Sequence, residues 1–476
     1  MKKVVSLTLS AAMALSCASV LLAGCGRDGG ISDYEHTIVF YSSQGDALVQ
    51  QTAVAIQNFE AKYPGWKVYH TQPGGYDEVK EKVVSDLQAD QQPDLAYCYA
   101  DHVAQYLSTE QVIDMKSLIE STETVTGVGI DAQTGEQIAA EYTVGYSTEE
   151  LEDFISGYYE EGKATNFSDY ESFGYTDDSM LTLPFVKSTE LLYYNADALK
   201  KLGLKVPETW DELWAQAPTI KEFYPKATVL GYDSEANWFI TMCEQNGWGY
   251  TSAQGNHFQF NSNNEDLKTW LNSLNGYYKN GYLTTQQDYK AYTSALFTKG
   301  IENGAGGIVY CIGSSGGASH QSSNLFKAAI APIPGTRKAD GTIDNSVISQ
   351  GPSLVMFNAG NGVSNADEKA KMTFLFIKEL LDPTFQAQFS IAAGYNPSRN
   401  SVYDIPAYQK HMEGNGMTAM ACKAAKDLND RFFTSPAFVG SSTARTQVGN
   451  ALYYVMRGEK NADAALSDAY KNCGGK

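Results

Sequence analysis

The chain has 476 residues, a formal net charge of −20 and seven cysteines. This length indicates two domains or one large two-lobed domain, and the negative charge disfavours binding to nucleic acid or anionic lipid head groups. The cysteines form no C-x-x-C pair and have no histidine at metal-ligand spacing. We therefore expect no disulfide framework, no metal site and no cofactor.

The N-terminus predicts export and lipid attachment. Lys2 and Lys3 precede an apolar run that ends in the sequence LAGC, a lipobox whose last residue is Cys25. Residues 1–24 would be the cleaved signal peptide and 25–35 a glycine-rich tether. A transmembrane anchor is the alternative, but serines and a threonine interrupt the apolar run. We therefore expect an extracytoplasmic protein that lipidated Cys25 anchors to the cell membrane.

Strands and helices alternate over the first part of the mature chain. Residues 37–41, 66–70 and 94–99 have the composition of strands, and residues 46–62 and 76–89 have helical periodicity. This alternation is typical of a mostly parallel sheet that helices cover on both faces.

Ligands of such sheets bind beyond the carboxyl ends of the strands. This rule predicts Ser43 and Gln44 as binding residues after the first strand, and Tyr99 and Asp101 after the third. The alternative role of Asp101 is to cap the helix that follows.

Residues 119–180 contain fifteen acidic residues and one basic residue, Lys163. The charge pattern predicts a solvated acidic insertion. The acids do not follow the spacing of a calcium-binding loop, so we expect no calcium site there.

The rest of the chain can be ordered around residues 181–213, LTLPFVKSTELLYYNADALKKLGLKVPETWDEL. Residues 190–194 have the composition of a buried strand, and Asn195 is placed to cap a helix over 196–202. The sequence TWDE is a capping box that opens the next helix, and Pro218 predicts a break or kink in that helix.

The landmarks LPFVKST, LYYN and PETWDEL resemble the extracellular solute-binding proteins of ABC importers, family 1. The resemblance covers about residues 37–471 and implies an α/β fold of the two-lobe, periplasmic-binding-protein type (type II), with mostly parallel sheets flanked by helices and hinged by inter-lobe crossings. It implies a monomer that binds a small carbohydrate and delivers it to ABC importer permease subunits. The implied lobes are 36–187 with 314–355, and 188–313 with 356–476.

The sequences GGY, PFVKST and SQGPSL look closest to the glycerol-phosphate-binding branch of this family. That branch's binding positions fall on Tyr76, Ser188, Ser314, Gly351 and Tyr395, although core packing is an equal alternative for Tyr395. Two positions depart from the branch, since its acid after the third strand falls on Ala100 and its phosphate-facing arginine on about Ala437. We therefore expect a neutral mono- or oligosaccharide, and a glycerophosphodiester is the alternative if Arg399 or Arg445 replaces the missing cation.

The aromatic composition also suits a carbohydrate. The chain has 31 Tyr against 6 Trp and 20 Phe, and a tyrosine offers both a ring face and a hydroxyl to a sugar. We expect Trp238 to supply a stacking face from the second lobe, while Asp101 and Gln44 hydrogen-bond the ligand from the first.

Residues 306–312 predict a strand, and the family resemblance implies that this strand returns the chain to the first lobe. The resemblance also implies that the small residues of the following turn, GSSGG, let the ligand approach the backbone at Ser314 and Ser315. The turn also matches G-x-S-x-G, so a secreted serine hydrolase with Ser315 as nucleophile and a histidine such as His411 is an alternative. Because no HGGG-type oxyanion segment precedes it, we expect a binding protein and no enzyme. A cell-surface adhesin is a third alternative, but it would not need crossings between lobes.

Overall fold

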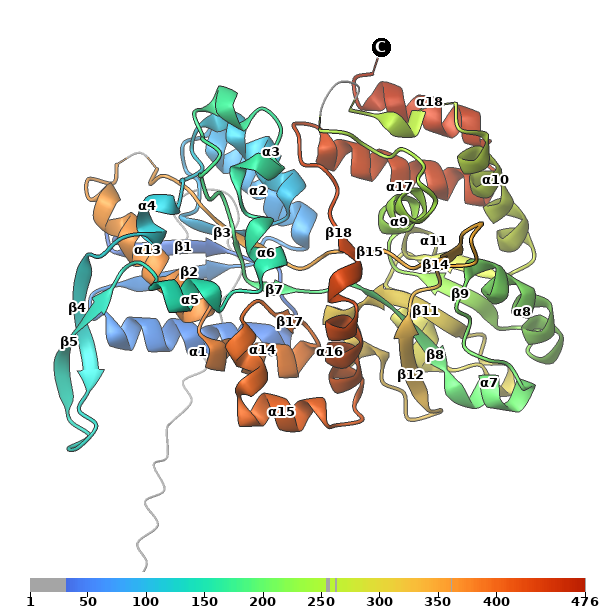
Figure 1. Cartoon of the computed structure of the whole chain (residues 1–476), viewed down its shortest axis with the longest axis horizontal. Helices are drawn as coiled ribbons and strands as arrows, with labels where there is room; N and C mark the ends of the chain where they lie inside the picture. The colour runs from blue at the N-terminus through green and yellow to red at the C-terminus, as the bar shows by residue number, and fades with distance from the viewer. Residues whose placement is uncertain (1–30, 254–256, 262, 361, 476) are drawn as a thin grey trace, which may run out of the picture.

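The computed structural model of the chain describes residues 31–253, 257–261, 263–360 and 362–475. Two five-stranded sheets form the centres of two lobes that lie side by side (Figure 1). This architecture confirms the predicted two-lobe α/β fold. The predicted signal peptide and Cys25 lie outside the described residues. No helix in the described ranges is long and apolar enough to cross a membrane.

The first sheet has the order β2-β1-β3-β16-β6. Its strands are β1 (Thr37–Tyr41), β2 (Lys67–Thr71), β3 (Leu95–Cys98), β16 (Ser353–Met356) and β6 (Leu183–Pro184). Side chains of β1 alternate between two cores, with Ile38 and Phe40 in one and Val39 and Tyr41 in the other. A strand buried on both faces gives this pattern, because successive side chains point to opposite sides of the sheet.

Helices cover both faces of the first sheet. They are α1 (Asp46–Lys62), α2 (Tyr76–Gln88), α3 (Ala100–Tyr106), α13 (Ala366–Leu380) and α14 (Pro383–Ala393). Phe59 of α1 and Phe376 of α13 pack edge-on at 5.3 Å between ring centroids, and Phe376 also contacts Phe40 of β1. Val79 of α2 and Val103 of α3 are buried in the core on the opposite face.

The second sheet has the order β10-β9-β11-β8-β12. Its strands are β8 (Glu190–Asn195), β9 (Thr228–Tyr232), β10 (Leu283–Thr285), β11 (Ile308–Ser314) and β12 (Ala328–Pro332). The helices of this lobe include α7 (Ala196–Leu202), α8 (Trp210–Phe223), α9 (Glu235–Asn246), α10 (Glu265–Lys279), α16 (Met417–Asp427), α17 (Ser441–Arg457) and α18 (Ala462–Asn472). Buried residues of the sheet and of these helices form one large core.

The predicted helix caps of the second lobe are confirmed, but the predicted break at Pro218 is wrong. Asn195 Oδ1 accepts the Ala198 amide at 2.9 Å, and Thr209 Oγ1 accepts the Glu212 amide at 3.2 Å. Helix α8 continues through Pro218 to Phe223. Proline removes one backbone donor from a helix, and the buried residues on either side of it, Ala217 and Ile220, hold α8 against the core.

The predicted lobe boundaries after residue 313 differ from the structure. Strand β12 pairs antiparallel with β8 of the second sheet, so the segment after β11 stays in the second lobe and β11 does not return the chain to the first. Conversely, α13 packs into the core of the first lobe. An apolar helix pattern predicts that one face is buried but does not specify which sheet buries it.

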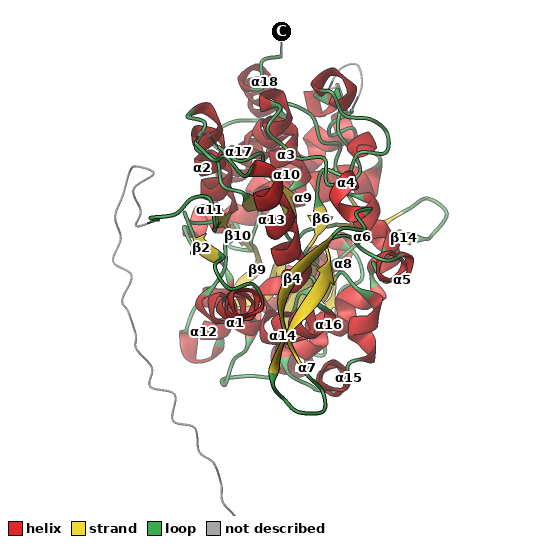
Figure 2. Cartoon of the chain, turned by 90° about the vertical axis from the view of Figure 1, so that its left-hand side faces the viewer, coloured by secondary structure: helices red, strands yellow, loops and turns green. Residues whose placement is uncertain are grey.

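Residues 119–180 are more structured than a solvated insertion. Strands β4 (Thr124–Ile130) and β5 (Gln137–Thr143) form a hairpin that projects from the first lobe (Figure 2). Beyond it, α5 (Thr148–Glu152) and α6 (Ser156–Glu160) alternate with turns. Phe154, Tyr158 and Phe167 are buried. The acids therefore lie on a segment whose apolar residues complete the first lobe.

Several chain crossings pair with one another between the lobes. Ser188 and Gln350 exchange two backbone hydrogen bonds of 2.8 Å, and β17 (Asn396–Pro397) pairs with β7 (Val186–Lys187). Gly351 has φ +95°, and a Cβ there would lie 2.4 Å from the Val186 carbonyl oxygen. Glycine is required at this position by both conformation and space.

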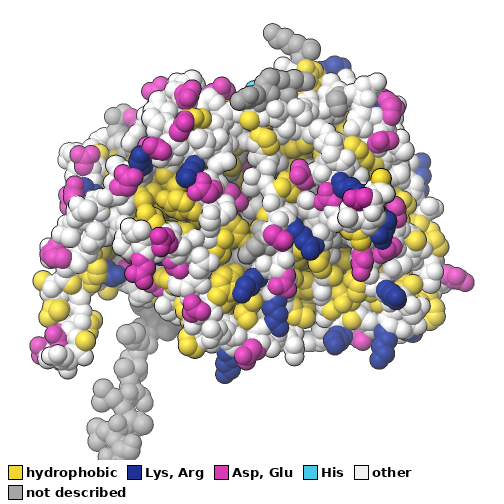
Figure 3. Space-filling view, viewed as in Figure 1, with side chains coloured by type: hydrophobic (Ala, Val, Ile, Leu, Met, Phe, Trp, Pro, Cys, Tyr) yellow, Lys and Arg dark blue, Asp and Glu magenta, His cyan; other side chains and the backbone are white. Residues whose placement is uncertain are grey.

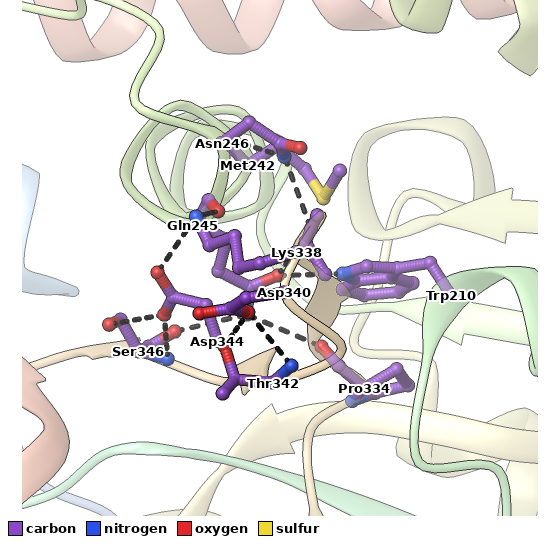
Figure 4. Close-up of polar contacts among 11 residues, drawn as sticks. Trp210, Met242, Gln245, Asn246, Pro334, Lys338, Asp340, Thr342, Asp344 and Ser346 are labelled. Atoms are coloured by element: carbon purple, nitrogen blue, oxygen red, sulfur yellow. Dashed lines mark hydrogen bonds and ion pairs between the residues drawn. The ribbon is translucent and has the colours of Figure 1, made fainter.

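The crossing before Gly351 is held to the second lobe by Gln245 of α9 (Figure 4). Its Nε2 donates to the carbonyl oxygens of Pro334 and Ser346, at 3.3 and 3.1 Å. Its Oε1 accepts the Trp210 indole N–H at 2.9 Å. Because Gln245 is fully buried with its amide satisfied on both ends, the chain leading into this crossing has a fixed anchor.

Candidate functional site

Two tyrosines of the first lobe lie at the start of helices that follow sheet strands. Tyr76 opens α2, and Tyr99 precedes α3 directly after β3. Their rings stack with centroids 4.7 Å apart and an interplanar angle of 29°. Burial raises the pKa of both phenols well above their ordinary range, so both hydroxyls stay protonated.

Tyr395 joins this pair from the chain that follows α14. Its side chain is hydrogen-bonded to that of Tyr76. A Cβ at position 316 would lie 2.5 Å from the Tyr395 ring, so the ring packs directly on Gly316, just after β11 of the second sheet. Tyr395 therefore spans the two lobes. We call Tyr76, Tyr99 and Tyr395 the tyrosine wall.

The other predicted residues of the first lobe follow β1 and β3. Asp101 lies in the first turn of α3, where the N-cap is Tyr99, so the capping role considered for Asp101 is wrong. Ser43 is half-buried after β1. Gln44 donates through Nε2 to the Tyr97 hydroxyl and accepts from Thr52 Oγ1 at 2.9 Å. Its amide is thus already bound inside the first lobe.

The second lobe contributes charged and amide groups. Glu190 opens β8 and is 1% exposed; its carboxylate accepts the Tyr232 hydroxyl and, at 2.9 Å, the Asn237 side-chain amide. Burial raises the pKa of Glu190 to about 7. Arg445 of α17 donates to Asn237 Oδ1.

Asp233 is a second acid of this lobe, half-buried at the carboxyl end of β9. Its Oδ1 accepts the Thr293 hydroxyl at 2.7 Å. Burial raises the pKa of Asp233 to about 6. We call Glu190, Asp233, Asn237 and Arg445 the charged wall.

The two walls approach each other through α17. Lys80 of α2 donates to Ser442 Oγ of α17 at 3.0 Å. The charge of Arg445 lowers the pKa of Tyr99 in the first lobe and of Tyr250 in the second, against the larger effect of burial. Arg445 therefore lies near both lobes.

The expected stacking role of Trp238 is wrong. Trp238 is 1% exposed, and its ring stacks on Tyr232 with centroids 4.9 Å apart and lies 5.7 Å from Trp210. Most of the residues around it in α9 are also buried, so an aromatic residue in this helix packs in the core whichever side it faces.

Three predicted binding residues take structural roles. Ser188 is buried in the paired crossings, as is Gly351. Ser314 Oγ accepts the Gly316 amide at 3.1 Å, and its carbonyl oxygen accepts the Tyr193 hydroxyl at 2.9 Å. The structure brings these residues to the region between the lobes but engages their groups in the protein itself.

Ser315 does not have the geometry of a nucleophile. It is fully buried, and its Oγ accepts the Thr189 amide of the first crossing at 3.2 Å. A hydrolase needs this hydroxyl exposed beside a base. Two glycines of GSSGG have a structural cause, because a Cβ at Gly313 would lie 2.7 Å from Asp233 Oδ2 and one at Gly316 would lie 2.5 Å from the Tyr395 ring.

Within the described ranges, no group of three or more His, Cys, Asp or Glu could hold a metal ion. The cysteines of those ranges are free thiols, namely Cys98, Cys243, Cys311, Cys422 and Cys473. Two surface pockets lie away from the two walls, one beside Tyr63 and Met372 and one beside Lys338 and Arg431.

Charge is unevenly distributed over the face of the molecule that Figure 3 shows. In Figure 3 acidic side chains are spread over both lobes, whereas most Lys and Arg lie on the half formed by the second lobe. Two cations near the crossings are already paired, Lys187 with Glu161 and Arg399 with Asp153. Arg445 therefore differs from both, since no ion pair is found for it among the described residues.

The sequence predictions missed Glu190, Asp233 and Asn237 as site residues. Glu190 carried a signal, because an acid opens a run that is otherwise apolar and directly follows a crossing. Asn237 carried none, since nothing in the sequence distinguishes it from the other polar residues of α9. Its role depends on two partners far away in the sequence.

Comparisons with known proteins agree with this architecture. The sn-glycerol-3-phosphate-binding periplasmic protein UgpB of Yersinia pseudotuberculosis is 25% identical over 356 residues, which cover 69% of this chain and 76% of the relative. UgpB of Mycobacterium tuberculosis, solved with glycerophosphocholine, superposes with a TM-score of 0.69 at 17% identity, over 92% of this chain and 97% of that one. The GacH receptor of Streptomyces glaucescens, solved with and without acarbose, gives a TM-score of 0.67 at 16% identity, over 92% and 98% of the two chains.

The two structural matches establish the fold alone. The family model described as bacterial extracellular solute-binding protein matches residues 54–415. Proteins of this family bind small solutes outside the cytoplasm and deliver them to ABC importers. With more than half of its length matched, the chain belongs to the bacterial extracellular solute-binding protein family.

Proposed function

We propose that the protein binds an uncharged mono- or oligosaccharide between its lobes and delivers it to the permease of an ABC importer. The observation that carries this proposal is the tyrosine wall. Stacked Tyr76 and Tyr99 and the bridging Tyr395 offer ring faces and protonated hydroxyls together. A sugar presents C–H faces and hydroxyls in the same arrangement, so both kinds of group find partners.

The charge of the surroundings supports an uncharged ligand. The chain has a net charge of −20, and Asp101, Glu190 and Asp233 lie at the facing ends of the two sheets. An anion brought to this region is repelled by the net negative charge of the chain, whereas a neutral ligand is not.

The crossings provide a mechanism of delivery by lobe closure. The backbone pairing of Ser188 with Gln350 and of β7 with β17 gives the lobes a common hinge. A ligand held by both walls stabilises the closed arrangement, because residues of both lobes contact it only then. The permease would recognise the closed form.

A glycerophosphodiester is the second candidate, and Arg445 favours it. A guanidinium suits a phosphate because its planar N–H groups can bind two oxygens at once. The relatives named above as binding glycerol-3-phosphate or glycerophosphocholine support the same candidate. The two candidates differ in ligand charge and can be separated by salt dependence.

Isothermal titration calorimetry with a panel of neutral mono- and oligosaccharides and with glycerophosphodiesters tests the proposal. We expect at least one neutral sugar to bind with an affinity that changes little between low and high salt. Tight, salt-sensitive binding of a glycerophosphodiester without binding of any neutral sugar would establish the second candidate.

We also propose that Cys25 carries the lipid that anchors the protein and that the receptor acts as a monomer. The LAGC sequence supports the anchor. Cys25→Ala should give an unprocessed precursor or a protein that leaves the detergent phase in Triton X-114 partitioning. Unchanged partitioning would exclude this site of attachment, and light scattering of the mature protein tests the monomer.

A further inference from the structure

The segment 434–440 runs along the boundary between the two lobes. It leaves β18 (Phe432–Phe433), which lies between the lobes, and enters α17 of the second lobe (Figure 1). Both of its ends are fixed, since β18 pairs with β15 (Val347–Ile348) and Ser441 Oγ, at the start of α17, donates to the Phe438 carbonyl oxygen at 2.8 Å. We call residues 434–440 the strap.

Ala437 attaches the strap to the first lobe. Its side chain is 2% exposed and lies in the first-lobe core that also contains Phe167 and Val103. Its backbone pairs with Phe167, and the Ser168 amide donates to its carbonyl oxygen at 2.8 Å. Phe167 and Ser168 belong to the acidic segment 119–180, so this segment holds the strap to the first lobe.

The next residue, Phe438, attaches the strap to the second lobe. Its side chain is 1% exposed, and its ring stacks on that of His257 with centroids 4.5 Å apart and an interplanar angle of 12°. The Phe258 ring lies 5.8 Å from it and contacts Tyr470 of α18 in turn. Two consecutive residues of the strap are therefore buried in different lobes.

The attachment to the first lobe is the weaker of the two. Ala437 buries a single methyl group, whereas Phe438 buries a whole aromatic ring, and the free energy of burial rises with apolar area. Beside the strap, Ser168 Oγ donates to the Ala253 carbonyl oxygen of the second lobe at 2.9 Å in an exposed position. Exposed hydrogen bonds and one methyl group cost little to separate. The contacts of Ala437 can therefore break while Phe438 stays in place.

We propose that the strap is a reversible contact between the lobes, in which Ala437 leaves the first lobe when the lobes open and returns when they close. The contact favours the closed arrangement, so it sets the fraction of the receptor that is closed before a ligand arrives. This inference rests on the proposed function, because it requires lobes that open and close around a solute.

Small-angle X-ray scattering of the ligand-free Ala437→Asp variant tests the strap. The substitution places a charge in a site that is 2% exposed, so the strap should leave the first lobe and the radius of gyration should exceed that of the wild type. Val439→Asp is the matched control, because it adds the same charge two residues away at a side chain that is 52% exposed. A folded Ala437→Asp protein with an unchanged radius of gyration would overturn the proposal.

The same two variants are compared in the calorimetric panel with whichever neutral sugar the wild type binds. Ala437→Asp should bind that sugar about threefold to tenfold more weakly, because the apparent affinity falls with the population of the closed state. Val439→Asp should bind it as the wild type does. The melting temperature of each variant reports folding separately.

Amide hydrogen exchange of the wild type tests the strap without a substitution. The Ser168 amide donates to Ala437, so it should exchange about tenfold more slowly with the bound sugar than without it. The Ala198 amide is the control, because Asn195 accepts it within the second lobe, and its exchange should not change. This measurement decides on the strap even where Ala437→Asp does not fold.

The outcomes separate this inference from the proposed function. If the wild type binds a sugar and the Ser168 amide exchanges equally fast with and without it, the strap is a fixed packing contact and the receptor function stands. If the wild type binds no member of the panel, the proposed ligand class is wrong, and the scattering of Ala437→Asp still decides on the strap.

Discussion

The two walls that face each other between the lobes are built in different ways. The tyrosine wall consists of neutral rings and hydroxyls, and two of its three residues directly precede or open helices of the first lobe. In the charged wall, hydrogen bonds connect Glu190 of β8 to Asn237 of α9 and Asn237 to Arg445 of α17, whereas Asp233 at the end of β9 is bound separately by Thr293. The tyrosine wall offers a ligand ring contact area, whereas the charged wall offers directional hydrogen bonds.

This difference has an energetic basis. Ring faces gain from contact area and tolerate small displacements. Hydrogen bonds to buried charged groups depend on geometry, and an unsatisfied partner is costly. We therefore expect substitutions in the tyrosine wall to reduce affinity gradually and substitutions in the charged wall to act through orientation, protonation or stability.

The largest expected effect concerns Trp238, which was expected in the ligand-binding surface of the second lobe and lies in its core. Trp238→Ala should reduce the free energy of unfolding by about 3–5 kcal/mol, because it removes a ring that is 1% exposed in the core. Trp238→Phe should restore part of the loss. Guanidinium denaturation measures both. A Trp238→Ala protein that is as stable as the wild type but binds ligand more weakly would show that Trp238 contacts the ligand and would contradict its assignment to the core.

The next effect is the change in stability with pH that follows from the protonation of Glu190. Burial raises the pKa of Glu190 to about 7 from its ordinary value of 4.5, so the folded protein retains a proton that the unfolded chain releases between these values. The contribution of Glu190 to stability is therefore present below about pH 4.5 and is lost as the pH rises to 7, by about 3 kcal/mol.

Glu190→Gln isolates this contribution because glutamine does not titrate. The unfolding free energy of the wild type minus that of the variant should fall as the pH rises from 4.5 to 7. Burial lowers the pKa of His70 to about 4, which acts in the opposite direction but cancels in the difference. A difference that stays constant with pH would show that Glu190 is ionised throughout.

The tyrosine wall should show a graded response. Tyr99→Ala should weaken ligand binding by roughly 1–3 kcal/mol through lost ring contact, and Tyr99→Phe by less, because the ring face remains. Tyr289→Ala is the control, since Tyr289 is exposed and lies outside both walls. Calorimetry with the identified ligand checks the order. Equal losses for Phe and Ala would assign the whole effect to the hydroxyl.

The smallest expected effect concerns the hydrogen bond between Lys80 of the first lobe and Ser442 of the second. Lys80→Met removes the hydrogen bond from Lys80 to Ser442 but keeps most of the side-chain stem. We expect affinity to fall by about 0.5–1 kcal/mol, because this bond supports only the closed arrangement. Calorimetry and small-angle scattering with ligand would detect it. Unchanged affinity would mean that the lobes close without this contact.

Much of the architecture followed from local patterns. Alternating strand and helix periodicity predicted the parallel pairing of β1 with β2 and β3 in the first lobe, and Asn195 and Thr209 marked two helix starts that the structure confirms. The same patterns located Tyr99, because a residue after a buried strand of a parallel sheet must lie at the ligand-binding edge.

The sequence by itself therefore determined the fold class, the caps and the place of Tyr99 at a strand end, since each depends on neighbours within one or two helical turns. Tertiary structure alone decided which lobe buries α13 and β12, that Trp238 lies in the core, and that Glu190 and Arg445 meet through Asn237. These outcomes depend on partners many residues away. An apolar or polar pattern specifies that a side chain needs a partner, but only the packed chain selects which partner it meets.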